Sequence, residues 1–138
     1  MNSDTVEKFV LPDPLELRKS AVKHSLEHWQ QLYRLTDEEL RKQFNGVGPD
    51  RWPAEIRNIL SEILWDVLEA VEIHDVDYYL GGDEKAFHEA NRILGKNVRK
   101  LARKKYRWWK PRRWFLVEVS RIMEEATDKY GWEGWNKR

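Results

Sequence analysis

The 138-residue chain contains no cysteine, no long apolar run and no strand-like alternation of polar and apolar residues. Without cysteine, neither disulfides nor thiolate metal sites can form, so packing and hydrogen bonds must hold any functional site. Without about 18 consecutive apolar residues, a membrane-spanning helix is not expected. The polar start Met1-Asn2-Ser3-Asp4 lacks the basic-then-apolar pattern of a signal peptide, so secretion by that route is not expected.

Length and composition predict one helical domain. Apolar residues make up 41% and charged residues 36% of the chain, which is typical of a soluble and strongly helical protein. A chain of 138 residues is long enough to bury a core. We therefore expect the all-α class, as a single small helical domain with two long antiparallel core helices and flanking helices. The expected organisation is a flexible segment at 1–11, a helical domain at 12–130 and a tail at 131–138.

Apolar residues at three-, four- and seven-residue spacing predict where the helices lie. Thr36 and Glu39 form the pattern of a capping box, and Asp83 is a good N-cap after Gly81 and Gly82. A helix from 54 to 80 would be about 40 Å long at ~1.5 Å per residue, a length compatible with a bend. The expected helical ranges are 12–35, 36–43, 54–80, 84–108 and 112–130.

Charge is divided unequally along the chain. Residues 1–90 carry 10 Lys and Arg against 19 Asp and Glu, whereas residues 91–138 carry 15 against 5. A basic C-terminal part favours a polyanionic partner, either phospholipid or nucleic acid. The same division is also expected if the acidic and basic parts attract each other within one domain.

Two short segments, 44–49 and 74–78, indicate the two halves of an active site. Gly46 and Gly48 allow the first segment to form a tight loop that turns its backbone carbonyls toward one point. Asp75 directly follows the apolar stripe of a helix, where a buried carboxylate is costly unless a cation satisfies it. Calcium binds carboxylate and carbonyl oxygens, so Asp75 and the loop make a chemically sensible half of a calcium site.

His74 lies beside this site and is suited to act as a general base. Its ordinary pKa near ~6.5 allows it to take a proton from water at neutral pH. Tyr78 lies one helical turn further along the same face and can anchor the surrounding network through its hydroxyl. The alternative interpretation is structural: His74 is then a hydrogen-bonded core residue, Asp75 helps to end a helix, and the loop is an ordinary turn.

The two segments resemble the phospholipase A2 superfamily, whose calcium loop has the pattern X-C-G-X-G and whose catalytic helix carries H-D-X-X-Y. The resemblance covers residues 44–94, and the nearest look-alikes are cysteine-free forms encoded by phages or bacteria, of the type N-G-x-G-P … HDxDYxxGG. It implies a calcium-dependent hydrolase of phospholipid acyl esters from a phage or prophage setting. Such a protein is expected in the cytoplasm or the virion, with peripheral membrane contact.

The resemblance also implies a role for each matching residue. His74 would deprotonate the attacking water, and Asp75 would bind calcium together with the backbone carbonyls of Phe44, Gly46 and Gly48. The ion would polarise the ester carbonyl and stabilise the oxyanion, assisted by the Gly46 N–H.

This chain departs from the family at several positions. Asn45, Val71 and Asp77 stand where secreted members have cysteine. Asn91 is the nearest equivalent of the carboxylate that orients the catalytic histidine from the following helix. An Asn oxygen accepts a hydrogen bond from the imidazole and fixes its tautomer, but it does not stabilise the imidazolium as a carboxylate would.

A basic and aromatic segment follows, and residues 99–114 contain no acid. Cations interleaved with tryptophans favour a membrane–water interface, and the lipid surface agrees with a lipolytic site. Buried tryptophans with cations that bind nucleic acid phosphates are the alternative. Trp132 and Trp135 are expected to add to a lipid anchor. The residues assigned to the lipid surface are Arg103, Lys104, Lys105, Arg107, Trp108, Trp109, Lys110, Arg112, Arg113 and Trp114.

Two other functions stay open. An all-α metal phosphohydrolase of the HD type would use His28, the His74-Asp75 pair and a late aspartate such as Asp128, but it leaves the glycine loop and Tyr78 unexplained. A non-enzymatic phage or prophage protein would bind nucleic acid or another protein through residues 96–114.

Overall fold

The computed structural model describes residues 10–44, 46–48 and 52–135, and helices are the only regular structure in these ranges. The all-α prediction is therefore confirmed. The α-helices are α1 (Pro14–Lys23), α2 (Asp37–Gln43), α3 (Ala54–Ile63), α4 (Leu68–Leu80), α5 (Glu84–Lys105) and α6 (Pro111–Tyr130). Short 3₁₀ helices are η2 (Trp29–Arg34), η3 (Trp65–Val67) and η4 (Gly131–Gly134).

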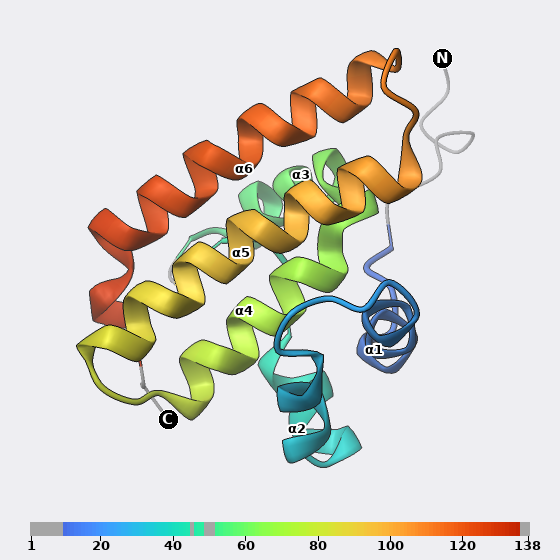
Figure 1. Ribbon diagram of the computed structural model, residues 1–138. Coiled ribbons are helices and arrows are strands. Elements are labelled where there is room, and N and C mark those ends of the chain that lie inside the picture. Colours follow the sequence, from blue (N-terminus) through green and yellow to red (C-terminus); the bar gives the residue numbers. More distant parts are fainter. Residues whose placement is uncertain (1–9, 45, 49–51, 136–138) are drawn as a thin grey trace.

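The two longest helices, α5 and α6, lie side by side and run antiparallel, and α4 lies against α5 (Figure 1). Apolar side chains of α4 face those of α5, as with Ile73 and Val76 against Leu94 and Val98, and all four are almost completely buried. Removal of this apolar surface from water stabilises the bundle by about 25 cal/mol per Å². None of the described helices has the length and apolar composition needed to cross a bilayer.

Local signals place several helix ends where the sequence predicts them. Thr36 and Glu39 form both bonds of the capping box at the start of α2. Asp83 caps α5 by accepting a hydrogen bond of 2.8 Å from the backbone N–H of Ala86. Gly81, with φ of 72°, follows the last residue of α4.

Three predicted helical ranges are wrong in extent. The range 12–35 ends at Lys23, because Ser25 and His28 adopt left-handed φ values of 53° and 67°. The range 54–80 is interrupted over Leu64–Val67, where the chain turns so that the Asp66 side chain enters the interior. The range 84–108 ends at Lys105, because the following Tyr106 is extended.

The expected tail at 131–138 is also corrected, as far as residue 135. Residues Gly131–Gly134 form η4, and Trp135 is buried against Tyr78 and Phe87. The Trp135 indole donates a hydrogen bond of 3.0 Å to the Gly82 carbonyl. Trp135 is therefore part of the core and is not available as a lipid anchor.

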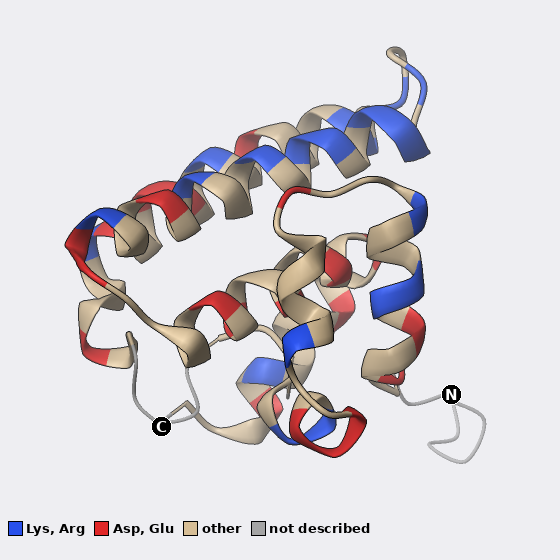
Figure 2. Cartoon of the chain, turned by 60° about the horizontal axis from the view of Figure 1, so that its bottom comes forward, with Lys and Arg blue, Asp and Glu red and all other residues tan. Residues whose placement is uncertain are grey.

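The unequal charge along the chain is used partly inside the domain. Figure 2 shows Lys and Arg along the two long helices and the turn that joins them. Lys105 of α5 binds Glu69 of α4 at 2.8 Å, and Lys96 of α5 pairs with Glu27. Some of the basic residues of the C-terminal part therefore pair with acidic residues of the N-terminal part within the domain.

The buried carboxylate of Asp66 joins η3 to the start of α6. It accepts hydrogen bonds from Arg112 at 2.7 and 3.0 Å and from the Tyr106 hydroxyl. Burial opposes the charge, but these bonds outweigh it, so the pKa of Asp66 lies below its ordinary value. The interaction therefore stabilises the fold at neutral pH and weakens as the pH falls through this lowered pKa.

We expect Asp66→Ala to lower the free energy of unfolding by about 3 kcal/mol, since it leaves Arg112 without its buried partner. Urea denaturation at pH 7 measures this loss. Glu118→Ala is the matched control, because the Glu118–Arg121 pair is well exposed and contributes little. Equal losses in the two variants would contradict the role given to Asp66.

Candidate functional site

The structure brings three of the predicted catalytic residues together. His74 and Tyr78 project from α4 toward Asn91 of α5, and His74 and Asn91 are both buried. His74 Nε2 lies 3.0 Å from Asn91 Oδ1, and the Tyr78 hydroxyl donates to the same oxygen at 2.7 Å. The imidazole also packs against the Tyr78 ring, with the ring centroids 4.3 Å apart. One amide oxygen thus holds both side chains of the H-D-X-X-Y segment.

The surroundings of His74 keep it neutral at neutral pH. Burial lowers its pKa below the ordinary value, although the Asn91 bond and the charge of Asp77 act in the opposite direction. An amide oxygen accepts and cannot donate, so the proton of the neutral ring belongs on Nε2. The lone pair of His74 is therefore on Nδ1, as a general base requires.

The glycine loop packs against the N-terminal half of α4. Gly46 and Gly48 have φ values of 99° and 100°, a conformation that favours glycine. The loop is tied to α3 by a hydrogen bond of 2.9 Å from the Val47 N–H to the Ser61 hydroxyl. A Cβ on Gly46 would lie 2.5 Å from that hydroxyl, so this position has no room for a side chain. Of the predicted loop, Asn45 and Pro49 lie outside the described residues.

Apolar contacts hold this loop against the part of α4 that precedes the predicted calcium ligand, Asp75. Phe44 and Val47 pack in one cluster with Leu68 and Val71 of α4. Val71 precedes Asp75 by one helical turn, so the loop lies over the face of α4 that leads to Asp75. Asp75 itself is half-buried.

A second acid, Glu72, lies on α4 between Val71 and His74 and is fully buried. Neither of its carboxyl oxygens has a hydrogen-bond partner among the described residues. Burial, reinforced by the charge of Asp75, raises the pKa of Glu72 to about 9. Glu72 therefore keeps its proton at neutral pH and carries no charge there.

The donor set fits calcium, which takes carboxylate and carbonyl oxygens. Asp75 supplies a carboxylate, and Phe44, Gly46 and Gly48 would supply carbonyls. Within the described ranges, no three His, Cys, Asp or Glu side chains group as a metal site. A calcium ion here would therefore need backbone oxygens of the loop in addition to Asp75.

His28, which the HD-type alternative assigns to a metal site, binds an acid that is not part of that alternative. His28 Nδ1 lies 2.9 Å from the carboxylate of Asp77, which is buried and also binds Gln31. This bond raises the pKa of His28 despite the partial burial of the ring. His28 therefore serves to hold the turn before η2 against α4, whereas His74 faces Asn91.

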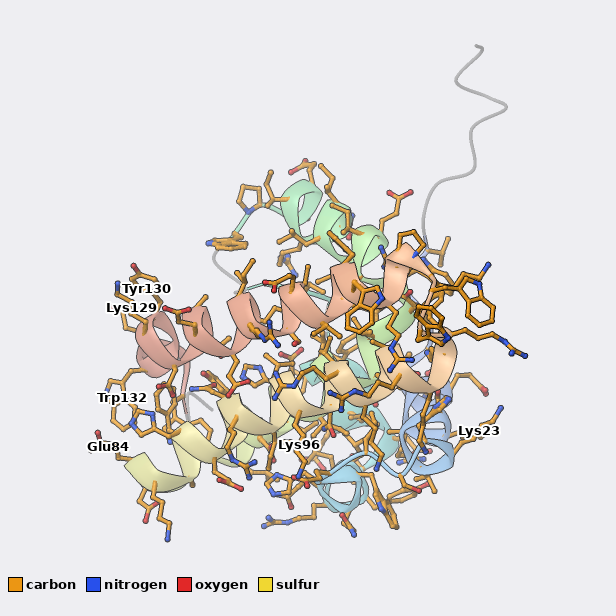
Figure 3. All side chains as sticks on the ribbon, turned by 45° about the horizontal axis from the view of Figure 1, so that its top comes forward. Lys23, Glu84, Lys96, Lys129, Tyr130 and Trp132 are labelled. Atoms are coloured by element: carbon orange, nitrogen blue, oxygen red, sulfur yellow. The ribbon has the colours of Figure 1, made fainter. Side chains whose placement is uncertain are left out.

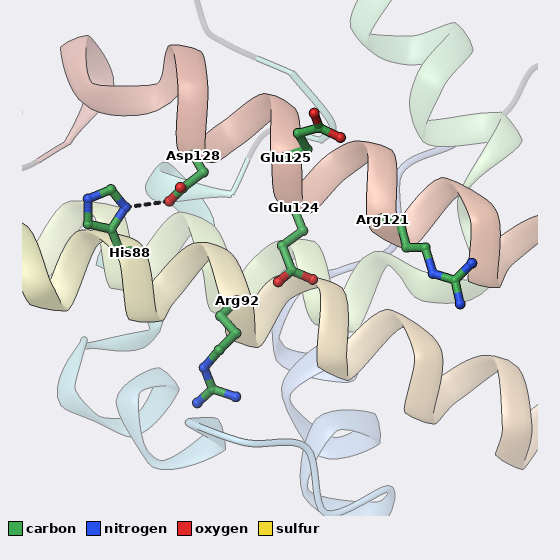
Figure 4. A pocket seen from close by; sticks show the side chains of 6 residues that line it. All are labelled: His88, Arg92, Arg121, Glu124, Glu125 and Asp128. Carbon is green, nitrogen blue, oxygen red and sulfur yellow. Dashed lines mark hydrogen bonds and ion pairs between the residues drawn. The ribbon is translucent and has the colours of Figure 1, made fainter.

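Sequence reasoning missed the contact that Asp128 makes. Asp128 of α6 accepts a hydrogen bond of 3.1 Å from Asn91 Nδ2 and lies 2.6 Å from His88 Nδ1. Figure 4 shows His88 and Asp128 pointing toward one another. They line a hollow of about 500 Å³ between α5 and α6. Chemistry alone predicts that such a contact exists, because a buried Asn needs an acceptor for the protons of its amide nitrogen. The sequence does not say which of the acids supplies it.

The basic aromatic segment lies where α5 turns into α6. Figure 3 shows its side chains at the end of the molecule opposite Glu84, Tyr130 and Trp132. The three tryptophans of this turn, Trp108, Trp109 and Trp114, are 68%, 54% and 52% exposed. The nucleic-acid alternative assumed buried tryptophans, and these are not buried.

Some of the cations assigned to the lipid surface are used inside the domain. Lys105 and Arg112 bind buried acids, and Lys104 and Arg113 donate to backbone carbonyls. Arg103, Arg107 and Lys110 are exposed.

The buried side chain of Glu72 predicts how the stability of the protein depends on pH. Its raised pKa means that the folded state binds the proton more tightly than the unfolded chain, so wild-type stability falls as the pH rises from about 4.5 toward 9. We expect Glu72→Gln to be more stable than the wild type by about 3 kcal/mol at pH 7 and equally stable at pH 4. Chemical denaturation at both pH values, with a chelator present, measures the difference.

Glu69→Gln is the control for this prediction. Glu69 is also buried on α4, but it accepts hydrogen bonds from Ser20 at 2.6 Å and from Lys105 at 2.8 Å. Its replacement should destabilise the protein at pH 7. A loss of stability in Glu72→Gln at pH 7 would contradict the raised pKa that burial gives Glu72.

Comparisons of this chain with protein-family models, with curated proteins and with solved structures find no match. No relative therefore supplies a function, and the chemistry of the residues around His74 is the ground for one. A shared fold would not by itself identify the function, since one fold supports many activities.

Proposed function

We propose that this protein is a calcium-dependent hydrolase of phospholipid acyl esters, similar to phospholipase A2. The observation that carries the proposal is the convergence of His74 Nε2 and the Tyr78 hydroxyl on one oxygen of Asn91. The H-D-X-X-Y resemblance implies such a network. The sequence of α4 alone, however, does not require that Asn91 of α5 lies close to His74 and Tyr78. The glycine loop packed over Val71 supports the same function.

The chain's own residues account for activation of water. His74 Nδ1 accepts a proton from the attacking water, while Nε2–H stays bonded to Asn91 Oδ1. Tyr78 donates to that same oxygen and so keeps the amide in place. Because burial lowers the pKa of His74, the basic form persists below the pH at which an exposed histidine would be protonated.

Calcium would be held by Asp75 and by the carbonyls of Phe44, Gly46 and Gly48. When bound, it supplies a positive charge that polarises the ester carbonyl and stabilises the oxyanion. The Gly46 N–H is assigned as a further donor to that oxyanion.

The surface around the α5–α6 turn suits an anionic lipid layer. The exposed Trp108 and Trp109 stand there between Arg107 and Lys110. Arg112 of α6 also donates to the Ile63 carbonyl at the end of α3, which joins the turn to a second apolar surface. That surface is the exposed row Ile56, Ile59 and Ile63 on one face of α3. Exposed apolar surface with polar residues around it is typical of interaction faces, including membrane-binding ones.

Hydrolysis is tested with anionic liposomes that carry a labelled sn-2 acyl chain. We expect release of labelled fatty acid with calcium and none with a chelator. His74→Gln should lower the rate at least about 100-fold, because it removes the general base. His24→Gln, which replaces a histidine of the α1 end, should keep the wild-type rate. Absence of release by the wild type with calcium would refute the proposal.

Lipid binding is tested separately by vesicle sedimentation. We expect Arg107→Gln and Lys110→Gln each to weaken binding to anionic vesicles about fivefold, since one cation near such a surface contributes about 1 kcal/mol. Lys129→Gln, at the opposite end of α6, should have no effect. If the protein binds duplex DNA with steep salt dependence and does not bind vesicles, the non-enzymatic nucleic-acid function is favoured instead.

A further inference from the structure

The buried amide of Asn91 has a definite direction. Its oxygen faces His74 and Tyr78, and its nitrogen faces Asp128 across the contact of α5 with α6. Asn91 has no exposed surface, so water does not compensate a reversed amide. A histidine and a tyrosine hydroxyl can each donate or accept, and they are therefore compatible with either direction of the amide.

Asp128 removes this ambiguity because an ionised carboxylate only accepts hydrogen bonds. The amide nitrogen must then point to Asp128, and the oxygen must point to His74. The pKa of Asp128 is lowered, first by the hydrogen bond from His88 and then by the one from Asn91, so the carboxylate is charged at neutral pH. His88 also fixes where the Asp128 oxygen lies, through the contact of 2.6 Å shown in Figure 4.

We propose that Asp128 is a positioning residue that sets the tautomer of His74 through the side chain of Asn91. With the amide oxygen against Nε2, the ring carries its proton there and keeps Nδ1 basic. With the amide reversed, an N–H would face Nε2, and the proton would move to Nδ1, where it blocks the general base. Asp128 thereby restores part of what a carboxylate at position 91 would supply directly.

The catalytic part of this inference rests on the proposed function, whereas the tautomer does not. The tautomer is read from nitrogen chemical shifts of ¹⁵N-histidine-labelled protein, with the signal of His74 assigned by its loss in His74→Gln. We expect the Nε2–H form in the wild type and a mixture of both forms in Asp128→Ala. Asp128 is 45% exposed at its side chain, so this variant is expected to fold. Circular dichroism checks that it does.

Measurement of kcat and KM separates an effect on the chemical step from an effect on substrate binding. We expect Asp128→Ala to lower kcat about tenfold with KM unchanged, which is less than the about 100-fold or more that a positioned base contributes. Glu125→Ala is the matched control, since it removes the same charge from an exposed residue of α6 that borders the same hollow. It should leave both the tautomer and kcat as in the wild type.

A double variant gives the sharpest test. Asn91→Asp places a carboxylate directly against His74, but next to Asp128 it forms a pair of like charges that share a proton. We expect Asp128→Ala to raise kcat in the Asn91→Asp background and to lower it in the wild-type background. Such a reversal of sign is not expected if Asp128 merely supports the fold.

The outcomes distinguish this inference from the proposed function. A pure Nε2–H signal in Asp128→Ala would overturn the role of Asp128, whatever the activity of the protein. Mixed tautomers in Asp128→Ala, together with no hydrolysis by the wild type, would support the positioning role and refute the hydrolase. A fall of kcat that is equal in Glu125→Ala would also overturn the inference.

Discussion

The side-chain amide of Asn91 is the interaction on which the centre of this molecule depends. It accepts from α4 at two side chains and donates to α6, so one buried group links the three helices around it. A buried amide left unpaired costs about 1–3 kcal/mol, and this cost favours the one arrangement of helices that satisfies all of its bonds. The same bonds give His74 its orientation, so the fold and the candidate site share a single constraint.

The charged side chains divide into those that are paired within the fold and those that stay exposed. The cations of α5 and the start of α6 first neutralise the buried acids Glu69 and Asp66 of the N-terminal part. The cations that remain exposed gather at the α5–α6 turn, next to three exposed tryptophans. Of the carboxylates on α4, Glu72 has no hydrogen-bond partner among the described residues. Glu72 consequently keeps its proton, whereas the paired charges lie inside the bundle and the exposed cations gather at the turn where lipid binding is proposed.

Helix ends followed the sequence wherever the signal was local. The capping box at Thr36, the Asp83 cap and Gly81 each act within a few residues, and each lies where expected. The interruption at 24–28 was not predicted, and the bend expected in 54–80 had no predicted position, because the contacts that accompany both come from far along the chain. His28 turns toward Asp77, and Asp66 turns toward Arg112. Apolar periodicity does not contain this information.

The candidate site divides in the same way. The spacing of His74 and Tyr78 by itself determined that both lie on one face of a helix, and the two glycines determined a tight loop, since both features depend only on backbone geometry. The tertiary structure decided that Asn91 meets both side chains, that Asp128 completes the amide, and that Trp135 is buried. Hydrogen bonds between helices depend on how the helices pack, and packing is fixed by all of the side chains at the contact rather than by any one motif.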